Sequence, residues 1–262
     1  MIKLKSKEQK LIYYKDELND EFSGAEITPR KIDENYKYIH KNIIWNTCAF
    51  LVQNVLSIPI KYLYAKIKFR VKYIGKEKLK PYKKQGYFIY GNHTQAFADT
   101  FLISNSVYPK INYLIVNPEN VSMKFLGNFV QMLGAIPIPN NIKGMKNFLD
   151  TIKLRIKKGN SITIFPEAHI WPYYTKIRPF KNVSFKYPVQ LDTPAFCVTN
   201  TYQSYGKNNK VRVVSYIDGP FFPDKDCNTM KERQQNLRDK IYNQMVERSK
   251  MSNVEVIKYK KM

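Results

Sequence analysis

The feature that most constrains the fold is a series of short apolar runs separated by polar turns and helical segments. Apolar runs with the length of buried strands occupy residues 87–90, 112–116, 135–138, 161–165, 195–199 and 211–217. Residues 145–156 instead repeat apolar side chains every three or four positions, which predicts an amphipathic helix. Another helix is expected from Thr229, where Glu232 completes a capping box. Strands separated by helices predict an α/β fold with a mixed, mostly parallel sheet flanked by helices.

The remaining segments divide the chain into three parts. Residues 1–40 are polar and weakly periodic, and we expect an extension that packs loosely. Residues 41–64 hold the most apolar stretch of the sequence and are predicted to form a helix. Residues 66–73 alternate basic and apolar side chains, which predicts a half-exposed strand. With the apolar runs, this strand makes 65–262 a single α/β domain.

The apolar stretch, residues 43–60, raises the question of a membrane. On a helical wheel its central polar side chains gather on one flank, opposite an apolar side: Asn46, Gln53, Asn54 and Ser57. So many polar residues fit an amphipathic helix that docks on a membrane better than a transmembrane helix. The basic residues that follow, up to Lys84, could bind anionic headgroups. The alternative is a helix packed on the domain beside a solvated lysine face.

The net charge and the cysteines bound the partners and the compartment. A net charge of +23 implies an anionic partner: nucleic acid, an anionic membrane surface or a phosphorylated substrate. Zinc-finger spacing, an RNP-type aromatic motif and an arginine-rich arm are all missing from the sequence, which disfavours nucleic acid. Cys48, Cys197 and Cys227 form no CxxC pair, so we expect a reducing compartment, with Cys48 and Cys197 buried as small apolar side chains.

Two polar clusters follow predicted strands, at the position where open α/β sheets bind ligands. In the first, His93 comes shortly after the run 87–90 and Asp99 stands six positions later. The two can meet if His93 lies in the turn and Asp99 in the first turn of a helix. Asp99 would then accept the Nδ1 proton and leave Nε2 free as a general base. The alternative is an aspartate that favours a helix N-terminus, beside a histidine that is merely buried.

The second cluster, Phe165-Pro166-Glu167, ends the run 161–165. Pro166 ends the strand and leaves Glu167 at the rim of the sheet, where it could bind a polar substrate or orient a basic group. A capping or salt-bridging glutamate is the alternative. Near His93 and Asp99 no third ligand stands at a metal-binding spacing, so no metal site is predicted.

Four segments in this order resemble the landmarks of the glycerolipid acyltransferases, the family of glycerol-phosphate and lysophosphatidate acyltransferases. They are Asn92-His93…Asp99, Gly134-Ala135-Ile136-Pro137-Ile138, Phe165-Pro166-Glu167 and Pro179-Phe180-Lys181. Lys124-Phe125-Leu126-Gly127 is similar to the loop that precedes the second landmark. The resemblance covers residues 65–220, and four landmarks in order are far more specific than any one of them.

The resemblance implies an O-acyltransferase that moves a fatty acyl group from an acyl thioester to a hydroxyl of a lysophospholipid such as lysophosphatidate. The donor would be acyl-CoA or acyl-ACP, and no metal or prosthetic group is implied. His93 resembles the catalytic base and Asp99 its orienting partner. The side chains expected to bind substrate are Asn92, Phe165, Pro166, Glu167, Arg178 and Lys181. The enzyme would act in phospholipid biosynthesis on the cytoplasmic face of a membrane.

The chain departs from the family at positions associated with the acceptor's phosphate. Five residues separate His93 from Asp99, one more than the family usually has. The second landmark commonly ends in an arginine where this chain has Asn140, and the third usually continues Glu-Gly-Thr-Arg where this chain has Glu167-Ala168-His169-Ile170. The cations that could replace those arginines are Lys143, Lys146, Arg178 and Lys181.

Two other interpretations therefore stay open. The acceptor could be a non-phosphorylated lipid or glycolipid. Alternatively, the chain could be a non-catalytic relative that binds lipid or nucleic acid.

Overall fold

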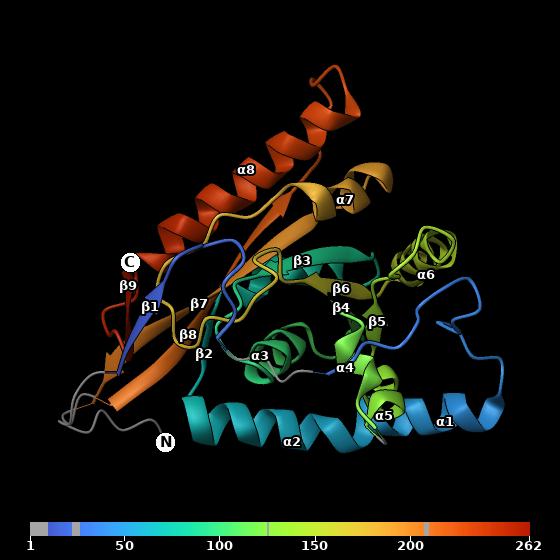
Figure 1. The fold of residues 1–262 in the computed structure, drawn as a ribbon, viewed down its shortest axis with the longest axis horizontal. Coiled ribbons are helices and arrows are strands. Elements are labelled where there is room, and N and C mark those ends of the chain that lie inside the picture. Colours follow the sequence, from blue (N-terminus) through green and yellow to red (C-terminus); the bar gives the residue numbers. More distant parts are fainter. Residues whose placement is uncertain (1–9, 23–26, 125, 207–209) are drawn as a thin grey trace.

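The computed structural model describes residues 10–22, 27–124, 126–206 and 210–262, and its centre is a seven-stranded sheet (Figure 1). The strands lie in the order β2-β8-β7-β3-β6-β4-β5. Their bounds are β2 (Lys72–Ile74), β3 (Tyr87–Gly91), β4 (Asn112–Val116), β5 (Ala135–Pro137), β6 (Ser161–Ile164), β7 (Ala195–Tyr205) and β8 (Lys210–Phe221). Every neighbouring pair is parallel except β7 and β8. The predicted mixed, mostly parallel sheet is confirmed.

The central strand β3 is buried along its whole length because its side chains enter two different cores. Phe88 and Tyr90 pack in the core shared with α6 (Met145–Lys157), α7 (Lys186–Gln190) and α8 (Met230–Ser249). On the opposite face, Tyr87 and Ile89 pack with α3 (Ala98–Val107). Burial on both faces explains why the strands read as continuous apolar runs and not as alternating ones.

Two of the three helices predicted from the sequence are α6 and α8. α6 buries Phe148 and Ile152, and the capping box of Thr229 and Glu232 begins α8. The shorter helices are α4 (Glu119–Ser122) and α5 (Gly127–Met132), with 3₁₀ helices at Lys76–Tyr82 and Val183–Phe185.

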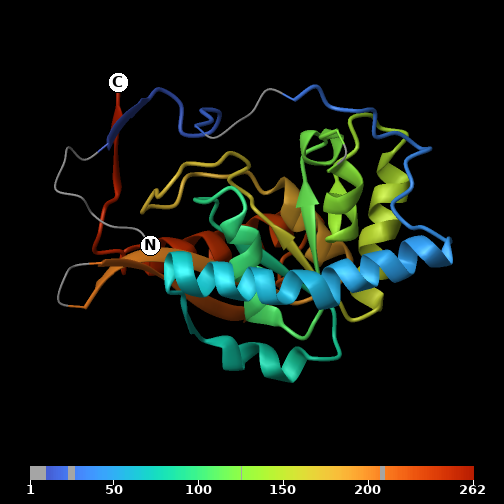
Figure 2. The ribbon, with the colours of Figure 1, turned by 90° about the horizontal axis from the view of Figure 1, so that it is seen from below.

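One continuous helix, Ile43–Phe69, runs across the lower side of the molecule, and we call it the long helix (Figures 1 and 2). It consists of α1 (Ile43–Leu51) and α2 (Ser57–Tyr64), each followed by a π-helical turn, Val52–Leu56 and Ala65–Phe69. The strand predicted at 66–73 is therefore wrong over most of its length, since β2 begins only at Lys72. The physical reason is that Ala65 and Phe69, one helical turn apart, are both buried in a core with β7 and β8.

Residues 10–22 and 27–42, here called the N-terminal segment, are not the loosely packed extension that their composition predicts. β1 (Lys10–Tyr14) pairs in parallel with β9 (Ile257–Lys261) in a separate two-stranded sheet. Ile32 and Tyr38 belong to the main core, and the Tyr38 hydroxyl donates to the Pro137 carbonyl at 2.9 Å. These apolar residues follow no helical or strand period, so the sequence pattern carried no signal for their burial. Residues 1–9 and 23–26 of the predicted extension, and Phe125, lie outside the described residues.

The predicted burial of two cysteines is confirmed for one of them and wrong for the other. Cys197 is buried in β7, as expected, whereas Cys48 is exposed. The prediction for Cys48 was wrong because no residue of α1 is buried against the domain.

Candidate active site

The turn after β3 brings His93 and Asp99 together in the way their spacing allows. β3 ends at Gly91, α3 begins at Ala98, and Asp99 lies in the first turn of that helix. His93 Nδ1 is 3.1 Å from Asp99 Oδ2. The additional residue in the motif is therefore accommodated by the loop without loss of the contact.

Asp99 is fully buried, and every contact to its carboxylate comes from an N–H donor. Oδ2 accepts the backbone N–H groups of Thr94 at 2.6 Å and Gln95 at 2.7 Å, in addition to the His93 ring. Oδ1 accepts the side-chain amide of Asn200 at 3.0 Å. A carboxylate held in this way can only accept from the imidazole, so we assign the proton of neutral His93 to Nδ1. The lone pair of Nε2 then remains for chemistry.

Asn92 holds the turn against β7. Its Nδ2 donates to the Asn200 carbonyl at 3.0 Å and its Oδ1 accepts the Asn200 N–H at 2.8 Å. Since the side chain is also buried, Asn92 is a positioning residue in this structure, and the substrate contact predicted for it is not supported. Asn200 itself was missed at the sequence level. No clear signal marked it, because Asn200 stands between Thr199 and Thr201 in β7. Its Oδ1 accepts the Ser215 hydroxyl at 2.6 Å.

Glu167 lies at the rim of the sheet, as predicted, but its carboxylate points inward. Oε2 accepts the backbone N–H of His93 at 3.0 Å, and Oε1 accepts that of Arg178 at 2.9 Å. Burial raises the pKa of the Glu167 carboxyl above its ordinary value, and the nearby Arg178 guanidinium opposes that rise. Glu167 thus fixes the backbone of His93, which favours orientation of the site over direct substrate contact.

Phe165 forms one wall of the site. Its ring stacks on the His93 imidazole, with centroids 4.2 Å apart and planes 11° from parallel. Gly91 permits this stack, because a Cβ at that position would lie 2.8 Å from both Phe165 and Ile103. Pro166, half-buried, follows Phe165, and β6 itself ends at Ile164. A glycine before Asn92-His93 is therefore a steric requirement of this site.

The comparisons with known proteins agree with this geometry. The family model described as Acyltransferase matches residues 70–200, which is half of the 262-residue chain and includes both polar clusters. The chain belongs to the acyltransferase family. The family resemblance drawn from the sequence is thereby confirmed.

Among solved structures, the fold of this acyltransferase is similar to that of the 1-acyl-sn-glycerophosphate (LPA) acyltransferase PlsC from Thermotoga maritima. The TM-score is 0.52 with 17% sequence identity, and the match covers 80% of this chain and 89% of that chain. No curated protein sequence matches the chain.

Arg178 of the acyltransferase is buried and is not a surface cation. Only 1% of it is exposed, its guanidinium lies over Trp171, and it donates to the carbonyls of Glu17, Glu167 and His169. The predicted phosphate contact is therefore not supported by its placement. Lys181 is exposed, on a loop that α8 holds through Arg238 and the Phe180 carbonyl.

The N-terminal segment contacts both positions at which the family usually has an arginine. Asn140 accepts the Ile32 N–H at 3.0 Å and donates to the Arg30 carbonyl at 3.1 Å. At the other position, Glu21 accepts the Ile170 N–H and lies 3.1 Å from the His169 ring. The places of the two arginines are thus used for intramolecular packing.

Trp171 connects the N-terminal segment to the turn that holds His93. Its indole N–H donates to the Asp20 carbonyl at 2.7 Å, and its backbone N–H donates to the His93 carbonyl at 3.2 Å. Tyr259 of β9 stacks on the same indole with ring centroids 5.1 Å apart. Sequence reasoning missed Trp171, because these partners lie far from it along the chain.

In the ranges that the structure describes, no group of three or more His, Cys, Asp or Glu side chains is placed to hold a metal ion.

Proposed function

We propose that this acyltransferase moves a fatty acyl group from an acyl thioester, acyl-CoA or acyl-ACP, to a hydroxyl of a lysophospholipid such as lysophosphatidate. The observation that carries the proposal is the His93–Asp99 contact, with Nδ1 held by Asp99 at 3.1 Å. Among the described residues none bonds to Nε2, and 13% of the His93 side chain is exposed. A held imidazole with one free nitrogen is suited to general-base catalysis near neutral pH.

In the proposed reaction His93 handles both proton transfers. Nε2 accepts the proton of the acceptor hydroxyl while its oxygen attacks the thioester carbonyl carbon. The tetrahedral intermediate then breaks the C–S bond, and the imidazolium returns the proton to the leaving thiolate. The products are an ester and a free thiol, and Asp99 stabilises the imidazolium between the two steps. This route uses no metal, prosthetic group or covalent acyl-enzyme.

The orientation of the long helix supports membrane docking of the enzyme. Its polar flank faces the protein, where Gln53 Nε2 donates to the Asn112 and Leu133 carbonyls. Its apolar flank is exposed, including Ile43, Phe50, Leu56, Ile60 and Ile67. A helix that turns apolar side chains away from its own domain needs another apolar phase, and a membrane surface provides one.

The long helix also satisfies the length and composition of a helix that crosses a membrane, with a mean hydropathy of 1.5 and only 6% of that stretch buried. Its polar contacts with the domain favour a helix lying on the membrane, and we propose the cytoplasmic face.

A thioester assay tests the catalytic proposal. Purified protein given acyl-CoA or acyl-ACP and lysophosphatidate should release free thiol. His93→Ala should reduce that release by about 10²–10⁴-fold. His40→Ala, at a histidine that stacks on Trp45 of the long helix, is the matched control and should retain activity. Thiol release that survives the loss of His93 would remove the proposed base.

A second candidate, acyl transfer to a non-phosphorylated lipid or glycolipid, is favoured by the enclosure of Arg178 and by Asn140. Parallel assays with lysophosphatidate and a monoacylglycerol of the same acyl chain separate the two candidates. A higher kcat/KM for the phosphorylated acceptor supports the first, and equal or reversed values support the second. Lipid binding without thiol release from any acceptor would indicate a non-catalytic relative.

A further inference from the structure

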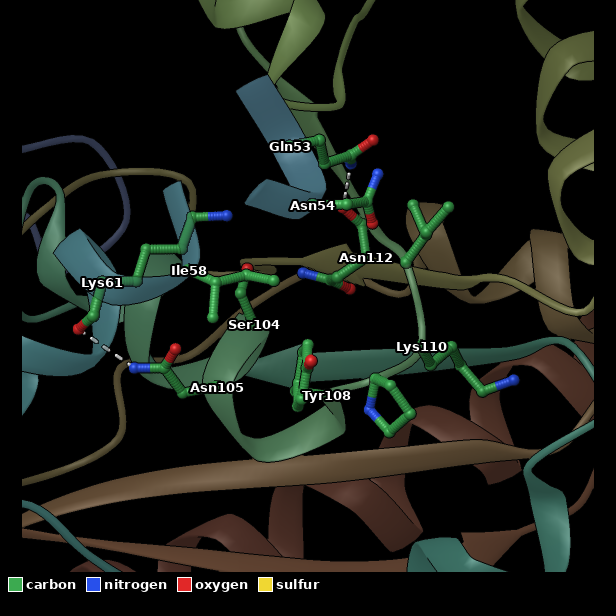
Figure 3. Close-up of a pocket in the computed structure, with 11 residues that line it drawn as sticks. Gln53, Asn54, Ile58, Lys61, Ser104, Asn105, Tyr108, Lys110 and Asn112 are labelled. Carbon is green, nitrogen blue, oxygen red and sulfur yellow. Dashed lines mark hydrogen bonds between the residues drawn. The ribbon is translucent and has the colours of Figure 1, made fainter. Parts of the chain in front are cut away.

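A small polar cavity lies between the long helix and the body of the domain, away from the catalytic turn (Figure 3). Its volume is about 30 Å³, and its polar lining is Gln53, Asn54, Lys61, Ser104, Asn105 and Asn112. The cavity lies at the C-terminal end of α3 and the start of β4, whereas His93 and Asp99 lie at the N-terminal end of α3. A ten-residue helix is about 15 Å long, so the cavity is a separate site.

Lys61 is one of two lysines that line this cavity. The residue is only 8% exposed, and among the described residues none forms a hydrogen bond or ion pair with its ammonium. Its carbonyl accepts Asn105 Nδ2 at 3.1 Å, which fixes the backbone but leaves the charge unpaired (Figure 3). Burial lowers the pKa of Lys61, in keeping with a cation that lacks a counter-ion.

The other lysine of the cavity, Lys110, differs from Lys61 because its ammonium is hydrogen-bonded. Lys110 lines the same cavity, but its ammonium donates to the carbonyls of Lys83 and Gln85. An unpaired buried cation is costly, whereas one that meets an anion is stabilised. The other polar lining groups are amides and hydroxyls, and no carboxylate lines the cavity. The side-chain amides of Gln53 and Asn105 already donate to backbone carbonyls, so the attraction for an oxygen anion comes chiefly from the Lys61 ammonium.

The position of the cavity indicates where the anion comes from. Ile60 and Leu63, next to Lys61 on the other side of the long helix, are exposed apolar residues. If they enter the acyl boundary by about 5–10 Å, the opposite flank of the helix lies at the level of the headgroups. The cavity, which lies on that flank, would then be at the level of the lipid phosphates.

We propose that this cavity binds the phosphate group of an anionic membrane lipid, with Lys61 as its counter-ion, at a site separate from the acyl-transfer centre. Bound phosphate oxygens would complete the pairing of the Lys61 ammonium. The site would thereby fix the rotation of the long helix on the membrane. This inference goes beyond the proposed reaction and does not depend on catalysis.

Vesicle binding of the full chain tests the proposal. Lys61→Met removes the charge and keeps an unbranched apolar side chain, and Lys66→Met removes an exposed charge from the same helix. Binding is measured to phosphatidylglycerol–phosphatidylcholine vesicles and to pure phosphatidylcholine vesicles at about 0.5 M salt, where exposed charges are largely screened. The wild type and Lys66→Met should retain their preference for anionic vesicles, and Lys61→Met should lose about tenfold of it. Equal losses in the two variants would overturn the proposal.

Thermal unfolding supplies the folding control and separates lipid from free phosphate. Without lipid, Lys61→Met should unfold at the wild-type temperature or higher, because it removes an unpaired buried charge. Anionic vesicles should raise the midpoint of the wild type more than that of Lys61→Met. Inorganic phosphate at the same phosphate concentration should not raise the midpoint of the wild type above that of Lys61→Met. If inorganic phosphate gives the full shift in the wild type and none in Lys61→Met, the lipid source is wrong and the cavity binds free phosphate.

Discussion

The long helix and α6 are both amphipathic, yet they present opposite faces to the protein. α6 buries its apolar stripe, with Phe148 fully enclosed, and leaves Lys146 in water. The long helix turns Gln53 towards the domain and leaves Leu56 58% exposed. Amphipathicity thus predicts a helix with two environments but does not say which of them is the protein. The exposed apolar flank of the long helix is the surface that the proposed membrane docking would cover.

The largest expected effect tests the inward-facing helix. Phe148→Ala should lower the free energy of unfolding by about 3–5 kcal/mol, because it leaves a cavity in the main core. Lys146→Ala on the same helix should change it by less than about 0.5 kcal/mol. Denaturant unfolding measures both. A small effect at Phe148 would mean that α6 does not anchor the core.

The next effect tests the exposed apolar flank of the long helix. Leu56→Asn should weaken binding to vesicles by about 2 kcal/mol, or roughly 30-fold, since a leucine side chain no longer leaves water. Its unfolding in the absence of lipid should stay within about 0.5 kcal/mol of the wild type. Val183→Asn, at a residue that is 57% exposed outside the long helix, is the matched control and should leave vesicle binding unchanged. Equal vesicle binding by both variants would contradict membrane docking by the long helix.

A smaller effect is expected from the polar flank that faces the domain. Gln53→Ala removes the bonds to two carbonyls, each 3.3 Å long, and should cost about 1 kcal/mol of unfolding free energy. Asn54→Ala is the control, because its amide donates to the Phe50 carbonyl within the same helix. If the two variants unfold alike, Gln53 does not fix the long helix on the domain.

The smallest effect is a difference in reactivity between Cys48 and Cys197, and it involves no loss of stability. Cys48 should react with a maleimide in the folded protein, and anionic vesicles should protect it, because it lies exposed on the long helix. Cys197 should react only after unfolding, since it is buried and burial raises the pKa of its thiol. Mass spectrometry after timed labelling distinguishes the two sites. Vesicles that leave the Cys48 rate unchanged would place that face of the helix in water.

Local patterns predicted much of the fold and the centre of the site. The apolar runs marked strands buried on both faces. The six-residue spacing of His93 and Asp99 allowed them to meet, and the family resemblance favoured that interpretation. The pattern at 66–73 failed because alternation in sequence cannot show that Ala65 and Phe69 are buried together in the long helix. There, tertiary packing overrode the local period.

Contacts between distant segments could not be predicted in this way. Arg178 was expected to bind phosphate, but its enclosure depends on Trp171 and on the Glu17 carbonyl of the N-terminal segment. Asn200 meets Asp99 only because β7 lies beside β3 in the sheet. The sequence supplies the chemical groups of the site, whereas the sheet order and the N-terminal segment determine which of them face a substrate.

The pairing of β1 with β9 has a consequence for the order of events during synthesis. Tyr259 stacks on Trp171, and Trp171 donates to the His93 carbonyl, so β9 takes part in holding the catalytic turn. Closing contacts across so long a stretch of chain is a late and entropically costly step of folding. A growing polypeptide can therefore carry His93 and Asp99 well before it can hold them firmly in place. Full catalytic competence should arise only after residues 257–261 have been made.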